Sequence, residues 1–145
     1  MMLKWGLYMN QNATIKLVQV STQQEITIDE VIEFFKKYQE KNARTGKQLN
    51  WDYSGHTFQY DIVVPENNEG KWFYLKSNKN GYHIIGVAVD QENGQHYIQI
   101  SLGEHSTHGD KNKAVEFCKL LGEKYKAEVH LFNKRKMYFY PRSSR

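Results

Sequence analysis

Two spacings of apolar residues alternate along this chain, and they constrain its fold more than any other feature. Between Thr27 and about Asn42, apolar residues recur every three or four positions, which is the period of one helix face. Residues 110–125 show the same period, whereas most of the remaining chain alternates apolar and polar residues in steps of two. The sequence therefore predicts two amphipathic helices among several strands.

The first predicted helix carries both a start and a stop signal. Thr27 and Glu30 have the spacing of a capping box, in which each side chain bonds to the backbone N–H of the other residue. Gly46 is a residue type that ends helices, so we expect this helix to run to about Asn42. Its predicted buried face contains Ile28, Val31, Ile32, Phe35 and Tyr38. The predicted buried face of the second helix contains Ala114, Phe117, Cys118, Leu121 and Tyr125.

Alternation in steps of two predicts the strands. They cover residues 13–20, 49–64 with a break at 54–55, 72–75, 84–89, 96–102, 129–132 and 137–140. Pro65 ends the second strand, because proline donates no hydrogen bond to a neighbouring strand. Asn93 and Gly94 lie between two alternating runs, which is a strong signal for a tight hairpin turn.

The resulting order of elements is β-α-β-β-β-β-α-β-β, without regular βαβ alternation or an internal repeat. This order predicts an α+β fold, with one largely antiparallel sheet and two amphipathic helices on one face. A chain of 145 residues suits a single domain, which we expect at residues 13–141. We expect residues 1–12 to form a poorly ordered extension, with translation starting at Met9, and residues 142–145 to form a polar tail.

Composition limits the classes of function. Cys118 is the only cysteine, which excludes an internal disulfide and a zinc site made of several cysteines. The chain shows neither a signal-peptide pattern nor the ~20 apolar residues of a membrane helix, so we expect a cytoplasmic protein without a membrane partner. The net charge of +4 is uneven, because residues 51–100 carry −3 and residues 101–145 carry +5. Such asymmetry is typical of a surface for an anionic partner or simply of a solvated helix.

The segment before the second helix, residues 103–111, is the strongest candidate site. Free backbone N–H groups and the helix dipole favour an anion at a helix N-terminus. The candidate ligand-binding residues for a small anion are Ser106, Thr107, Gly109 and Lys111. In the purely structural alternative, Thr107 or Asp110 caps the helix, Gly109 permits the turn, and the histidines are solvated.

The same segment also supports a metal site. His105, His108 and Asp110 provide two imidazoles and a carboxylate, which are ligand types of catalytic zinc and manganese centres. Three protein ligands leave a position for water, so these residues would suit a metal-assisted hydrolase. A further ligand would have to approach from another part of the fold.

Aromatic residues form 14% of the chain, and many fall on predicted strands. They are Trp51, Tyr53, Phe58, Tyr60, Trp72, Tyr74, Tyr97, Tyr138 and Tyr140. Exposed rings beside the basic turn 134–136 would be typical of single-stranded nucleic-acid binding, whereas buried rings would form the core beneath the helices. No ribonucleoprotein motif accompanies them, and nucleic-acid binding stays an alternative.

Known enzyme signatures are missing from the sequence. Cys118 lies on the apolar stripe of the second helix, where cysteine is a small buried hydrophobic residue. The nucleophile elbow, the His-Glu-x-x-His pair and the dinucleotide fingerprint are absent, so we expect no cofactor. We predict a cytosolic binding module that contacts a protein or a small anionic ligand through its sheet or through the loop before the second helix. We expect a monomer or a homodimer, since an exposed strand can pair between copies.

Several stretches of the chain resemble a small family of uncharacterised proteins from spore-forming Gram-positive bacilli. The stretches are residues 26–30, 45–51, 107–111, 116–118, 130–133 and 137–140. The resemblance covers residues 13–141 and implies a single α+β domain in a bacterial cytosol. It implies no activity and no site residues.

Overall fold

Nine elements form the described part of the fold, in the order that the sequence predicts. The structure is a computed structural model that describes residues 9–49 and 59–141. The elements are β1 (Met9–Lys16), α1 (Ile28–Leu49), β2 (Asp61–Val63), β3 (Trp72–Lys76), β4 (Ile84–Glu92), β5 (Gln95–Gly103), α2 (His108–Tyr125), β6 (Glu128–His130) and β7 (Lys136–Tyr138).

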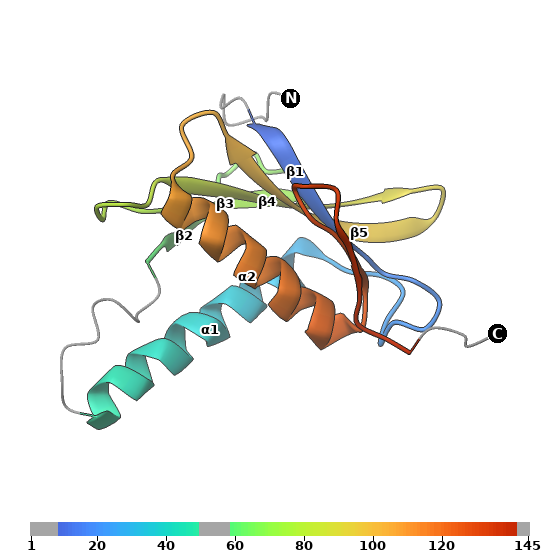
Figure 1. Cartoon of the computed structure of the whole chain (residues 1–145), viewed down its shortest axis with the longest axis horizontal. Helices are drawn as coiled ribbons and strands as arrows, with labels where there is room; N and C mark the ends of the chain where they lie inside the picture. Colours follow the sequence, from blue (N-terminus) through green and yellow to red (C-terminus); the bar gives the residue numbers. More distant parts are fainter. Residues whose placement is uncertain (1–8, 50–58, 142–145) are drawn as a thin grey trace.

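The seven strands form one antiparallel sheet in the order β2-β3-β4-β5-β1-β6-β7. β1 lies between β5 and β6, although it is the first strand of the chain. Both helices lie on the same side of the sheet (Figure 1). The predicted α+β fold, with two helices on one face of an antiparallel sheet, is confirmed. We call the face away from α1 and α2 the open face.

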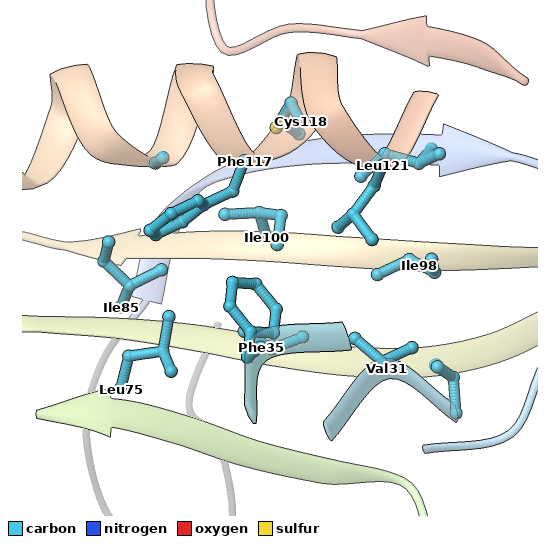
Figure 2. Packing of buried hydrophobic residues seen from close by; sticks show 14 of the residues in the cluster. Val31, Phe35, Leu75, Ile85, Ile98, Ile100, Phe117, Cys118 and Leu121 are labelled. Atoms are coloured by element: carbon cyan, nitrogen blue, oxygen red, sulfur yellow. The ribbon is translucent and has the colours of Figure 1, made fainter. Parts of the chain in front are cut away.

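The core fills the space between the helices and the sheet. Ile98 and Ile100 of β5 and Ile85 of β4 are fully buried on the helix side (Figure 2). The rings of Phe35 in α1 and Phe117 in α2 meet edge to face, with centroids 5.0 Å apart. All five residues predicted for the buried face of α2 are buried, which confirms the helical spacing as a guide to the core.

The capping box of α1 is confirmed, but the predicted end of this helix is wrong. The Thr27 N–H donates to Glu30 Oε1 (3.0 Å), and the Glu30 N–H donates to Thr27 Oγ1 (3.3 Å). The helix continues through Gly46 to Leu49. One glycine inside a helix costs about 1 kcal/mol relative to alanine, and the helix-favouring lysine, glutamine and leucine residues that follow it offset that cost.

The first two strands differ from the prediction. β1 starts at Met9 and pairs with β5, so residues 9–12, which we expected in the extension, belong to the sheet. β1 ends at Lys16 because a turn follows, in which the Val18 N–H donates to Ser21 Oγ (2.8 Å). β2 covers only residues 61–63 of the predicted strand 49–64. Residues 50–58, with Trp51, Tyr53 and Phe58, lie outside the described residues.

The predicted hairpins are confirmed. Asn93 and Gly94 have φ of 53° and 84° and form the two-residue turn between β4 and β5. The last hairpin has shorter strands than predicted, because its turn spans residues 131–135 and takes up the end of the predicted strand 129–132. Lys134 has a φ of 69° in this turn.

Candidate functional site

The loop before α2 is a helix cap, and α2 begins at His108, earlier than predicted. The Thr107 hydroxyl accepts a hydrogen bond from the Asp110 N–H (2.9 Å), and the Asp110 carboxylate accepts one from the Thr107 N–H (3.0 Å). The Thr107 hydroxyl also donates to the carbonyl of Gly81, in the turn between β3 and β4 (2.7 Å). The loop therefore fixes α2 to a neighbouring turn.

Asp110 is fully buried, and its carboxylate accepts several hydrogen bonds. The Tyr60 hydroxyl donates to Oδ1 (2.6 Å), and the His83 N–H donates to both oxygens (2.9 and 3.1 Å). Burial, together with this carboxylate, raises the pKa of Tyr60, so the phenol stays protonated and can donate. The Asp110 carboxylate thus occupies the positive end of α2, where the sequence suggested an external anion.

Gly109 lies in the first turn of α2 and not in the loop before it, so the role predicted for it in the turn is wrong. A Cβ atom at this position would lie 2.4 Å from the Gly81 carbonyl oxygen and 2.8 Å from Tyr82 Cε1. Glycine is needed here for close packing against the turn between β3 and β4. Of the other candidate anion-binding residues, Ser106 is half-buried and Lys111 is exposed.

The structure does not gather the predicted metal ligands. His105 is exposed, with 81% of its side-chain surface accessible, and His108 is also exposed, whereas Asp110 is buried and bonded to Tyr60. Within residues 9–49 and 59–141, no group of three His, Cys, Asp or Glu side chains is placed to hold a metal ion. His105, His108 and Asp110 therefore lack the geometry that the hydrolase alternative requires.

Cys118 of α2 is fully buried (Figure 2). Burial raises the pKa of its thiol to about 12, so the thiol is protonated at neutral pH. A protonated, buried thiol is a poor nucleophile, and Cys118 serves the core.

A second group of polar residues lies on the open face, where three neighbouring strands meet. The strand register places His130 of β6 between Thr14 of β1 and Lys136 of β7. The next row with the same orientation places Glu128 of β6 between Lys16 of β1 and Tyr138 of β7. We call these residues the sheet-face patch: Thr14, Lys16, Glu128, His130, Lys136 and Tyr138. Neighbouring strands are about 4.8 Å apart, so both rows are compact.

Glu128 and His130 are paired at the centre of the patch. Glu128 Oε2 lies 2.5 Å from His130 Nε2, and the Tyr140 hydroxyl donates to Glu128 Oε1 (3.3 Å). The hydrogen bond to His130 lowers the pKa of Glu128, so the carboxylate is charged at neutral pH. The two side chains keep 22% and 24% of their surfaces accessible. Unlike Asp110, this carboxylate is therefore in contact with solvent.

The surroundings of the patch are basic and partly aromatic. Lys134, Arg135 and Lys136 are exposed in and beside the last turn. Tyr138 is 36% exposed, and its ring meets that of Tyr140 edge to face, with centroids 5.9 Å apart. Of the other rings proposed for nucleic-acid stacking, Tyr60 and Trp72 are buried, at 2% and 6% exposed, whereas Tyr74 and Tyr97 are half-buried.

The sequence did not indicate the sheet-face patch as a unit. Residues 128 and 130 flank a buried valine, which is the pattern of one strand with two side chains on its solvent face. That pattern was readable, but the pairing with Lys16 depends on β1 lying beside β6, and the two strands are far apart in the sequence.

Comparison with known proteins gives one family and one similar solved structure. A family model described as a domain of unknown function (DUF1885) matches residues 11–141. A crystal structure of a protein of unknown function from Bacillus stearothermophilus is similar, with 32% sequence identity and a TM-score of 0.57. The match covers 85% of this chain and 96% of that one. No curated protein matches. The resemblance to a family of uncharacterised bacillar proteins is confirmed.

Proposed function

Since this chain belongs to the DUF1885 family, a domain family of unknown function, we propose a function from its own geometry. The chain is a binding module, and its sheet-face patch contacts an acidic segment of a partner protein. The observation that carries this proposal is the register of three strands, which gathers Lys16, His130 and Lys136 on a face that neither helix covers.

Charge supports an acidic partner. The patch contains the ammonium groups of Lys16 and Lys136, and Lys134 and Arg135 extend the positive charge into the adjacent turn. Its one carboxylate, Glu128, is bonded to His130 and also interacts with Lys16, so the cations of the patch and of the adjacent turn outnumber its acids. A cluster of this kind attracts acidic side chains and accelerates their association at low salt.

The shape of the patch supports an extended partner more than a small ion. The two rows of side chains cross β1, β6 and β7. A segment laid across these strands reaches both rows and also the exposed ring of Tyr138. Tyrosine and basic side chains together are common in protein interfaces.

Protein binding also fits the rings better than nucleic-acid binding does. A nucleic-acid platform needs open aromatic faces on which bases stack. Tyr138 and Tyr140 instead meet edge to face, at an interplanar angle of 87°, so one ring edge covers part of the other ring. The loop before α2 supports an anionic ligand less well, because Asp110 fills the end of the helix. We place the module in the cytoplasm, where a single buried thiol stays reduced.

The proposal is tested by titrating the full chain with hexaglutamate while recording amide shifts by NMR. We expect shifts at β1, β6 and β7, and an affinity that falls as salt rises. Lys16→Ala and Lys136→Ala should each weaken binding by about fivefold, as for a charge pair of about 1 kcal/mol. Lys36→Ala removes an exposed lysine of α1, and it should leave binding unchanged.

Two outcomes would overturn the proposal. One is the absence of shifts in the patch at low salt and millimolar peptide. The other is that oligothymidine binds this face more tightly than hexaglutamate does, with an affinity that falls steeply as salt rises. That result would establish the nucleic-acid alternative.

A further inference from the structure

A pocket lies on the helix side of the molecule, whereas the sheet-face patch lies on the open face. Its volume is about 450 Å³, and it is formed by the first half of α1, the last turn of α2 and the loop residues Thr22 and Gln23. Pockets of about 300–1,000 Å³ that combine apolar walls with a few polar groups are typical small-molecule sites.

Tyr125 supplies an unused hydroxyl at the α2 wall of this pocket. The residue is only 3% exposed, yet no described residue is hydrogen-bonded to its hydroxyl. Two other tyrosines of the core region have partners: Tyr60 donates to Asp110, and Tyr38 donates to Glu116. The hydroxyl oxygen keeps some contact with solvent, because it is not one of the fully buried polar atoms that lack a partner among the described residues. The hydroxyl of Tyr125 is therefore free to donate to a ligand.

Charged groups line both walls of the pocket. On the α1 wall, Asp29 and Glu33 are exposed acids one helical turn apart. On the α2 wall, the Lys124 ammonium lies 5.5 Å from the Tyr125 ring centroid. Glu30 also lines the pocket, and its carboxylate accepts hydrogen bonds from Thr27 and Gln23. Its charge interacts with Lys124 and helps to raise the pKa of Tyr125, so a ligand carboxylate would share Lys124 with Glu30.

The pocket also has an apolar part. Phe34 of α1 lines the pocket and is half-buried, with its ring edge to face against Phe35. The pocket thus offers an anionic wall, a cationic wall with a hydroxyl donor, and an aromatic surface.

We propose that this pocket binds a small zwitterion of the amino-acid class with an apolar side chain. Its ammonium group pairs with Asp29 and Glu33. Its carboxylate pairs with Lys124 and accepts the hydrogen bond from the Tyr125 hydroxyl, and its side chain packs against Phe34. This inference is independent of the sheet-face patch, which is on the other face of the sheet.

The test uses the full chain and four probes, with affinity measured from amide shifts. L-Phenylalanine and L-leucine are zwitterions, phenethylamine carries only the ammonium group, and 3-phenylpropionate carries only the carboxylate. We expect at least one zwitterion to shift amides of α1 and the end of α2, and each half-charged probe to bind at least about tenfold more weakly.

Two variants test the α2 wall and the α1 wall of the pocket separately. Tyr125→Phe should weaken the zwitterion about tenfold and leave phenethylamine unchanged, because it removes only the hydroxyl. Glu33→Gln, at an exposed position, should weaken both ammonium-bearing probes and leave 3-phenylpropionate unchanged. Tyr97→Phe on the open face is the matched control and should change nothing. The proposal is overturned if neither zwitterion binds at millimolar concentration, if phenethylamine binds as tightly as L-phenylalanine, or if Tyr125→Phe binds all probes like the parent.

Discussion

Asp110 and Glu128 are two carboxylates with similar neighbours and different consequences. Each bonds to a tyrosine hydroxyl, and each has a histidine beside it. Asp110 is fully buried and bonds to backbone N–H groups of the turns around it, whereas Glu128 bonds to side chains on a face that solvent reaches. The comparison shows that a polar cluster is available to a partner only where the protein does not use all of its hydrogen-bonding groups internally.

Removing the buried carboxylate should have the largest effect. Asp110→Ala leaves the Tyr60 hydroxyl and the N–H groups of Thr107 and His83 without their acceptor in the interior. We expect a loss of roughly 3–5 kcal/mol in the free energy of unfolding, measured by chemical denaturation. Glu104→Ala, at an exposed position of the same loop, is the control. If Asp110→Ala lowered the free energy of unfolding as little as the control does, the hydrogen bonds of Asp110 would not be what holds this loop.

Gly109→Ala tests the close packing beside that carboxylate. The added Cβ would be 2.4 Å from the backbone oxygen of Gly81, which cannot move without shifting the turn. We expect a loss of about 2–3 kcal/mol in thermal or chemical unfolding. Lys111→Ala, in the same helical turn but exposed, should stay within about 0.5 kcal/mol of the parent. Equal stabilities of the two variants would contradict the observed contact.

Tyr60→Phe removes one of the donors to Asp110 and keeps the ring. The variant should lose about 1–2 kcal/mol, because a charged acceptor loses one hydrogen bond and retains the others. Tyr140→Phe is the comparison on the open face, where the bond to Glu128 is longer and solvent can replace it, and we expect a smaller loss. A larger loss for Tyr140→Phe would reverse the contrast between the two carboxylates.

Glu128→Gln should have the smallest effect on stability and a defined pH dependence. Because the folded state lowers the pKa of Glu128, its charged form stabilises the fold above the pKa of the unfolded chain. This contribution is lost as the pH falls through the lowered pKa of the folded state. At pH 7 we expect the parent to be more stable by at most about 1 kcal/mol, and the difference to shrink in acid. Denaturation curves of both proteins at several pH values measure this, and a difference that grows in acid would contradict it.

The fold was largely predictable because its signals are local. The capping box at Thr27, the helical stripe around Phe117 and the Asn93–Gly94 turn each depend on neighbours in the sequence. The errors arose where a distant contact or a neighbouring segment decides the outcome. Residues 9–12 form a strand because β5 lies beside them, and α1 passes Gly46 because the residues after it favour a helix.

The candidate site was less predictable than the fold. Sequence reasoning identified the loop before α2 from its residue types, but whether Thr107 and Asp110 are free depends on Tyr60 and Gly81, which come from other parts of the chain. The sheet-face patch requires the strand order, because Lys16 and Glu128 become neighbours only when β1 pairs with β6. Residue type alone does not report which polar groups remain available.

The central position of β1 has a consequence for how the nascent protein folds. The ribosome makes this strand before the other described strands, and its partners in β5 and β6 emerge much later. Until then both edges of β1 lack their final hydrogen-bonding partners, and long loops must close before the sheet is complete. Folding of this domain should therefore be slow for its size, and the sheet should not be completed before β6 is synthesised. Until then the unfinished chain exposes unpaired strand edges, which chaperones bind.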